Sequence, residues 1–151
     1  MIDKRPKTPR EVAAFSLFSM AEESAWSDGA LHYYLGRASL DGRDAALAAR
    51  LTYGTVQNEM LLDWYLRRFS SLRLKKIAPR VLACLRMGLY QLIFMDKIPA
   101  HAAVAETVAL VKRYCRANDR TVSFANAVMR KAAEAAETAR RLCRVYLALG
   151  L

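Results

Sequence analysis

Basic side chains gather at three places in the sequence, and an aromatic residue accompanies one of these clusters. Lys and Arg can neutralise phosphates and an exposed ring can stack on an unpaired base, so the combination is typical of proteins that bind single-stranded RNA. Tyr114 lies within the third cluster and Phe124 follows it, although core packing would explain Phe124 equally well. The clusters are Lys4, Arg5, Lys7 and Arg10; Arg67, Arg68, Arg73, Lys75, Lys76 and Arg80; and Lys112, Arg113, Arg116 and Arg120.

The overall charge favours the same class of ligand. The 151 residues include 24 Lys and Arg against 14 Asp and Glu, which gives a formal net charge of +10 and a pI near 9.9. An ordinary solvated surface would explain any single basic residue, but it explains the excess poorly. A field of this sign attracts polyanions such as nucleic acid.

Residues that could carry catalysis are few and scattered. His32 and His101 lie far apart, and the sequence has no glycine-rich phosphate loop and no H-E-x-x-H motif. The three cysteines lack C-x-x-C spacing, which argues against a zinc site and a disulfide framework. Cys84 falls in an apolar segment that predicts an inert core position, while Cys115 falls in a basic loop, where neighbouring cations can lower its pKa. We therefore predict no catalytic residues, no metal site and no cofactor.

The same features predict a cytoplasmic protein with no membrane partner. The odd number of cysteines fits a reducing compartment. The N-terminus is polar and contains proline, so we expect no signal peptide. The most apolar run is shorter than a membrane span and contains Arg86.

That apolar run, residues 79–95, is expected to be the central helix. Pro79 suits the first helical position. Nearly every following residue is apolar, with Arg86 and Gln91 as the main interruptions, which is typical of a helix packed on several sides. We expect Leu85 and Leu89 to be buried, and we expect Gly88 to mark the close approach of another helix.

Periodicity and start signals predict six more helices and no strands. We expect Asp28 to cap the second helix and Asp41 to start the third. The fold class is therefore all-α with about seven helices, organised as a basic N-terminal arm at 1–8 and a single domain at 9–151. The first helix is expected to begin at Thr8-Pro9 and to end before Trp26. The next four are expected to run from Asp28 to about Ser39, from Asp41 through Val56, from Met60 to Phe69 and over 79–95. The last two are expected to begin at Pro99 and, after a loop at 114–120, at Thr121 or Ser123. Trp64 and Tyr90 are expected to pack in the core.

Two segments resemble the NusB-like RNA-binding family. They read LRMGLYQLIFMDKIPAHAAVAETVALVKR (85–113) and FANAVMRK (124–131), and the resemblance extends from about residue 9 to about 133. Pro99 to Val104, Leu51 to Val56, and Leu62-Asp63-Trp64 are most similar to one branch, the N-terminal domain of RsmB/Sun-type ribosomal RNA cytosine-C5 methyltransferases. Ala105, where that branch usually has Asn, and Gln57-Asn58 depart from its pattern, and residues 134–151 match nothing identified.

The resemblance implies a helical bundle that binds RNA through Arg10, with Lys7 nearby, and through Lys112, Tyr114 and Phe124. It implies ribosomal RNA as the ligand, and either a C-terminal methyltransferase domain in cis or a ribosomal protein as a possible partner. The chain has no Pro-Cys pair and no strands for a cofactor-binding domain, so we expect it not to be an enzyme by itself. Two alternatives are a free-standing NusB-like transcription antitermination factor and a helical protein-interaction domain whose charge is incidental.

Overall fold

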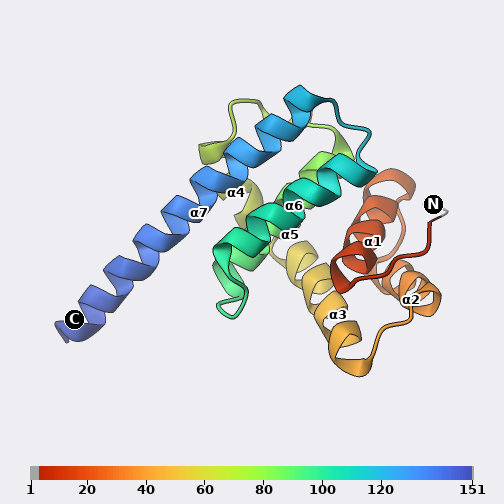
Figure 1. Ribbon diagram of the computed structural model, residues 1–151, viewed down its shortest axis with the longest axis horizontal. Coiled ribbons are helices and arrows are strands. Elements are labelled where there is room, and N and C mark those ends of the chain that lie inside the picture. The colour runs from red at the N-terminus through yellow and green to blue at the C-terminus, as the bar shows by residue number, and fades with distance from the viewer. Residues whose placement is uncertain (1–3, 151) are drawn as a thin grey trace.

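The computed structural model describes residues 4–150, without the side chains of residues 140 and 143, and this part of the chain contains helices and no strand (Figure 1). Residues 1–3 of the predicted arm and residue 151 lie outside it. The prediction of an all-α fold with about seven helices is confirmed. The helices are α1 (Pro9–Glu23), α2 (Ser27–Arg37), α3 (Gly42–Gln57), α4 (Glu59–Phe69), the short 3₁₀ helix η1 (Leu74–Lys76), α5 (Pro79–Phe94), α6 (Ala100–Tyr114) and α7 (Asp119–Ala148).

Helix α5 is the axis of the bundle, as its composition predicted. It packs against α1, α3, α4, α6 and α7, and Leu85 and Leu89 on it are both buried. Figure 1 shows α1, α2 and α3 together at one end of the molecule, α5 and α6 in the middle, and α7 running out to the other end.

Two glycines permit the closest helix contacts. A Cβ atom at Gly88 would lie 2.7 Å from Met129 Cε of α7 and would also press against the Thr107 hydroxyl of α6. A Cβ at Gly54 of α3 would lie 2.5 Å from Cε2 of Tyr90 on α5. Both distances are far inside van der Waals contact, so a side chain at either position would force the helices apart. The expected close approach at Gly88 is therefore present.

Side-chain caps fix several helix starts. Thr8 and Asp41 accept hydrogen bonds from the N–H groups of Glu11 and Asp44, at the positions where the sequence predicted these helices to begin. The predicted start of α7 at Thr121 or Ser123 is wrong, because Asn118 supplies the cap and accepts the N–H of Thr121. The loop between α6 and α7 therefore spans only 115–118.

The predicted cap at Asp28 is also wrong. Trp26 occupies the cap position of α2 without a side-chain bond. Asp28 lies one residue inside the helix, and its carboxylate accepts a hydrogen bond of 2.5 Å from the hydroxyl of Tyr53 on α3. Asp28 therefore joins two helices instead of starting one.

Helix α7 is the longest element, with 30 residues and a length of about 45 Å. Its first half packs against α4, α5 and α6. Its second half projects beyond every other helix and ends at the C-terminus (Figure 1). Among the described residues, no helix is both long enough and apolar enough to cross a membrane.

Candidate nucleic-acid interface

Glu11 is the buried centre around which the N-terminal arm and the end of α6 meet. The capping position places its carboxylate at the start of α1, where Oε2 accepts the Lys7 backbone N–H at 2.7 Å. Its other oxygen accepts a hydrogen bond from the Tyr114 hydroxyl at 3.1 Å. One carboxylate therefore joins the arm, α1 and α6. The contact with Tyr114 leaves no local signal in the sequence, because the two residues lie 103 positions apart.

Tyr114 is the last residue of α6 and not, as predicted, part of a loop. Its ring packs edge-on against Phe15 of α1, with ring centres 4.8 Å apart. The Lys4 ammonium lies 5.8 Å from the centre of the same ring. Burial and the nearby Glu11 carboxylate raise the pKa of the Tyr114 hydroxyl, so it remains a donor at neutral pH. The ring is only partly available for stacking, because the core holds one edge.

A shallow hollow of about 470 Å³ opens beside Glu11 and Tyr114. Its rim contains Lys4, Arg5 and Lys7 from the arm and Arg113 from α6. The Arg113 guanidinium lies 3.9 Å from the Glu11 carboxylate and is 65% exposed. Four cationic residues thus line one hollow together with a single carboxylate. We name this set of residues (Lys4, Arg5, Lys7, Glu11, Arg113 and Tyr114) the arm hollow.

Arg10 lies elsewhere, in the contact between α1 and α5. Its Nε donates to Oε1 of Gln91 at 2.9 Å. Gln91 is buried, and its Nε2 donates in turn to the Met87 carbonyl at 3.1 Å. The half-buried Arg10 side chain therefore satisfies a core amide and fixes the start of α1. This contact leaves Arg10 less free to meet a phosphate than its sequence position indicated.

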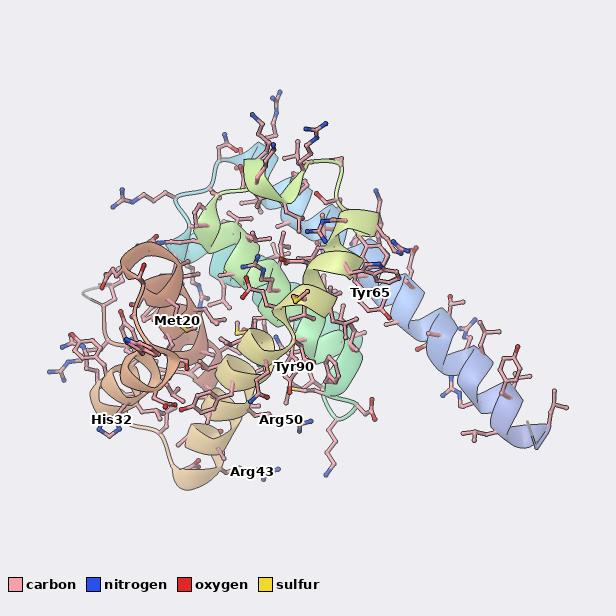
Figure 2. All side chains as sticks on the ribbon, turned by 180° about the vertical axis from the view of Figure 1, so that it is seen from behind. Met20, His32, Arg43, Arg50, Tyr65 and Tyr90 are labelled. Carbon is pink, nitrogen blue, oxygen red and sulfur yellow. The ribbon has the colours of Figure 1, made fainter. Side chains whose placement is uncertain are left out.

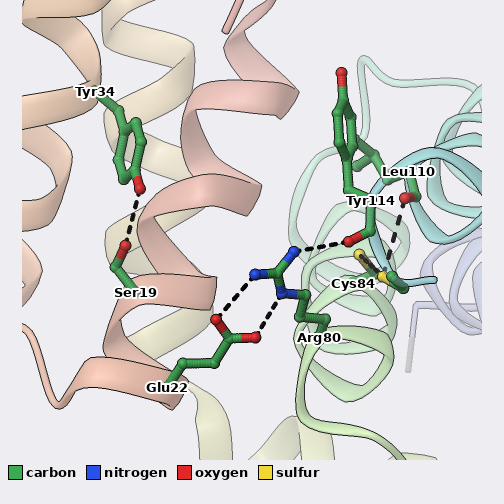
Figure 3. Close-up of polar contacts among 8 residues, drawn as sticks. Ser19, Glu22, Tyr34, Arg80, Cys84, Leu110 and Tyr114 are labelled. Atoms are coloured by element: carbon green, nitrogen blue, oxygen red, sulfur yellow. Dashed lines mark hydrogen bonds and ion pairs between the residues drawn. The ribbon is translucent and has the colours of Figure 1, made fainter. Parts of the chain in front are cut away.

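Arg80 holds the end of α6 against α1 (Figure 3). Its Nε and Nη2 donate to the Glu22 carboxylate at 2.5 and 3.0 Å, and its Nη1 donates to the Tyr114 carbonyl at 2.9 Å. The hydrogen bonds from Arg80 lower the pKa of Glu22. The sequence grouped Arg80 with the exposed cluster at 67–80. The spacing of Arg80, Cys84, Met87 and Gln91 could have shown that Arg80 lies on the buried face of α5, because these positions share one side of a helix.

The other predicted RNA contacts do not line the arm hollow. Lys112 is exposed on α6, and Arg120 is exposed in the first turn of α7. Arg116 is exposed in the loop between these helices, where its φ of 50° is in the left-handed region. Phe124 is partly buried and packs against the core. The structure therefore brings together five of the ten predicted residues and disperses the rest.

The two described cysteines lie side by side beneath this region. Cys84 on α5 is buried, as predicted, and its Sγ lies 3.8 Å from Sγ of Cys115 (Figure 3). The contact raises the pKa of the Cys84 thiol, and burial adds to the shift. The same hydrogen bond, together with the Arg80 charge, lowers the pKa of Cys115. Within the described residues, no group of three His, Cys, Asp or Glu side chains could hold a metal ion.

The second basic cluster forms a separate surface at the end of α4 and on η1. Arg67, Arg73 and Lys75 line its own shallow hollow. The predicted burial of Tyr90 is confirmed, whereas that of Trp64 is wrong. Trp64 is 45% exposed, and the Arg68 guanidinium lies 3.5 Å from the centre of its ring.

Comparison with known proteins establishes the class of this fold. The family model described as NusB family matches residues 7–134, and the chain belongs to this family. A solved structure of NusB from T. maritima superposes with a TM-score of 0.75 at 21% identity, covering 83% of this chain and 88% of that one. The fold is therefore the NusB-like fold, as the resemblance predicted.

The related sequences fall into two groups. A probable ribosomal RNA small subunit methyltransferase B of Bacillus subtilis is 33% identical over 121 residues, which is 80% of this chain and 26% of that protein. A putative methyltransferase of Mycobacterium tuberculosis is 38% identical over 106 residues, which is 70% of this chain and 23% of that protein. The transcription antitermination protein NusB of Bacillus licheniformis is 29% identical over 125 residues, which is 82% of this chain and 92% of that protein. The chain thus spans about a quarter of the length of these methyltransferases.

Proposed function

We propose that this chain is an RNA-binding accessory domain of the ribosomal RNA cytosine-C5 methyltransferase type, which binds ribosomal RNA and does not itself catalyse methylation. The observation that carries the proposal is the arm hollow, where Lys4, Arg5 and Lys7 meet Arg113 of α6. Clustered cations beside an aromatic ring suit a single strand of RNA. The named activity of the Bacillus subtilis relative supports ribosomal RNA as the ligand.

A second candidate function is that of a free-standing transcription antitermination factor, which would bind nascent RNA together with a protein partner such as a ribosomal protein. The observation that favours it is the similarity to the NusB of Bacillus licheniformis, which the matched region covers to 92%. Both functions place RNA on the same surface, so the arm hollow is tested first.

The proposed surface divides its residues into two roles. Lys4, Arg5, Lys7 and Arg113 contact phosphates, with Lys112, Arg116 and Arg120 extending the positive field along the chain. Arg10 acts mainly by fixing α1 on α5, since it already donates to Gln91. Tyr114 supports the hollow from below and offers the exposed part of its ring to a base, whereas Phe124 acts through the core.

Salt-dependent binding tests this surface. Fluorescence anisotropy with a single-stranded fragment of small-subunit ribosomal RNA is measured over a range of KCl concentrations. Each phosphate contact contributes about −0.7 to the slope of log K against log salt. The double variant Lys4→Gln/Lys7→Gln should therefore flatten the slope by about 1.4. The backbone N–H of Lys7 still reaches Glu11 in this variant, so the fold is retained.

The matched control lies on the second basic surface. Lys75→Gln/Lys76→Gln removes the same charge from exposed positions on η1 and should leave the slope nearly unchanged. Arg80 is unsuitable as a control because it bonds to Glu22 and to Tyr114. If the η1 variant loses binding while the arm variant and Arg113→Gln bind as the wild type does, the arm hollow is the wrong surface.

Two further measurements separate the candidate functions. An in-frame methyltransferase domain encoded downstream of residue 151, with preferential binding to ribosomal RNA fragments, supports the accessory domain. A stop codon there, with preferential binding to a transcript leader in the presence of a ribosomal protein, supports the antitermination factor.

A further inference from the structure

The projecting half of α7 carries an apolar face that no other described helix covers. Leu142, Tyr146 and Leu149 are 55%, 56% and 67% exposed. Figure 2 shows this part of α7 extending away from the bundle with its side chains in the open. Large apolar residues exposed in a row on one helix are typical of an interaction surface.

This face continues the stripe that anchors the first half of α7. Ala125, Val128 and Ala132 are buried against the bundle. Positions spaced alternately by three and four residues follow the a and d sites of a heptad repeat, which forms one seam along a helix. The seam therefore has a partner in its first half and none in its second. Its members are Ala125, Val128, Ala132, Ala135, Ala139, Leu142, Tyr146 and Leu149.

A groove lies beside the middle of this seam. It has a volume of about 280 Å³ and is open on one side, with Tyr65 and Phe69 of α4 and Leu89, Leu92 and Ile93 of α5 on one wall. The wall from α7 consists of alanines only, at 132, 135, 136 and 139. Small side chains on α7 thus leave room for large ones from outside.

We propose that a second copy of this chain occupies the groove, with the two α7 helices antiparallel. One register pairs small with large at every level of the seam. In it Ala132 faces Leu149 of the other copy, Ala135 faces Tyr146, and Ala139 faces Leu142. The register is symmetric about the midpoint of residues 140 and 141, as a two-fold symmetric interface requires. The three large side chains of each copy then enter the groove of the other.

The charges of the segment agree with this arrangement. Within the overlap, the described flanking positions Ala136, Thr138 and Val145 carry no charge, and the charged Lys131 flanks only the outer end of the seam, where it is exposed. Two copies can therefore meet without burying an ion, despite the net charge of +10.

The order of charges favours antiparallel over parallel pairing. Glu134 and Glu137 precede Arg141 and Arg144 along the helix. In this register Glu137 of one copy is level with Arg144 of the other, although Arg140 and Arg141 of the two copies also meet at the symmetry axis, whereas parallel pairing sets every charge beside its like. The two helix dipoles also point in opposite directions, and so attract each other, only in the antiparallel arrangement.

The size of the contact sets its expected strength. The seam from 132 to 149 is about 27 Å long, and the total buried area is on the order of 1,000 Å², near the lower limit of specific interfaces. We therefore expect reversible dimers that form at micromolar or higher concentrations.

Sedimentation velocity over a range of protein concentrations tests the dimer. Leu142→Glu and Tyr146→Glu should each raise the dissociation constant more than about tenfold, because a carboxylate would enter an apolar seam. Leu147→Glu is the matched control, since Leu147 is 74% exposed and lies off the seam, and it should dimerise as the wild type does. Circular dichroism checks that all three variants stay helical.

The size pairing permits a sharper test of the register. Ala135→Phe should weaken self-association by overfilling the seam, and Tyr146→Ala should weaken it by leaving a void. A mixture of these two variants should associate more strongly than either alone, because the ring added at position 135 of one copy fills the void left at position 146 of the other. A wild type that stays monomeric at every concentration, or a mixture no stronger than its components, would overturn the proposal.

Discussion

Gly54→Ala tests whether the crossing of α3 and α5 is as close as the structure has it. The added Cβ would lie 2.5 Å from Cε2 of Tyr90, whereas carbon atoms in contact are normally about 3.5–4.0 Å apart. The buried Tyr90 ring would have to retreat by about 1 Å, yet it stacks on Phe94 with ring centres 5.1 Å apart. Overpacking of this kind costs about 1–3 kcal/mol or more.

The helix propensity of alanine works in the opposite direction, by about 1 kcal/mol. We therefore expect a net loss of up to about 2 kcal/mol in the free energy of unfolding, measured by urea denaturation. Gly36→Ala is the control, since a Cβ there meets nothing within 4 Å, and it should be neutral or slightly stabilising. In a Tyr90→Leu background the cost of Gly54→Ala should largely vanish. If Gly54→Ala changes stability as Gly36→Ala does and shows no coupling to Tyr90, α3 and α5 do not cross as closely as the structure has it.

Three further predictions concern the core, one ion pair and the two described thiols. Leu85→Ala should destabilise the fold by about 2–5 kcal/mol, because Leu85 is buried; a loss under about 1 kcal/mol in urea melts would argue against α5 as the centre. Arg80 lowers the pKa of Glu22 in the folded state, so this pair stabilises the fold at pH values above the ordinary carboxyl pKa of 4.5. Its contribution to stability is lost as the pH falls through the lowered pKa of Glu22. The stability difference between wild type and Glu22→Gln should thus shrink on acidification, by at most about 1 kcal/mol for a half-exposed pair, and a difference that grows would contradict this sign. Cys115, whose pKa is lowered, should react with iodoacetamide faster than buried Cys84, as mass spectrometry of the native protein would show, and preferential labelling of Cys84 would refute the assignment.

The sequence predicted the fold well because its strongest signals were local. Thr8 and Asp41 are side chains that cap helices directly, and both do so. The start of α7 was misplaced because Asn118, Thr121 and Ser123 are all capping types within six positions. Which of the three caps the helix depends on where α6 ends and on the path of the loop that follows it. Asp28 was misassigned because its partner Tyr53 is on another helix.

The candidate site was less predictable, because a charge pattern does not say which way a side chain turns. The resemblance implied RNA contacts both near Lys7 and Arg10 and around Lys112 and Tyr114, and Lys4, Lys7 and Arg113 do line one hollow; their binding to RNA stays a prediction. Arg10 and Arg80 belong to the same clusters, yet they turn toward a buried amide and a carboxylate on other helices. Such contacts depend on tertiary packing and leave no mark in local composition.

The continuity of α7 has a consequence for avidity. A single helix runs without a break from the loop beside the arm hollow to the projecting seam. In the proposed dimer the two α7 helices would overlap along residues 132–149, and their starts would lie roughly 65 Å apart. The first turn of each α7 lies next to the basic surface of its own copy. Two weak sites held at a fixed distance bind a ligand long enough to span both with a greatly increased effective concentration, and they give a shorter ligand no such gain. A rigid helix would thereby select RNA by length as well as by charge.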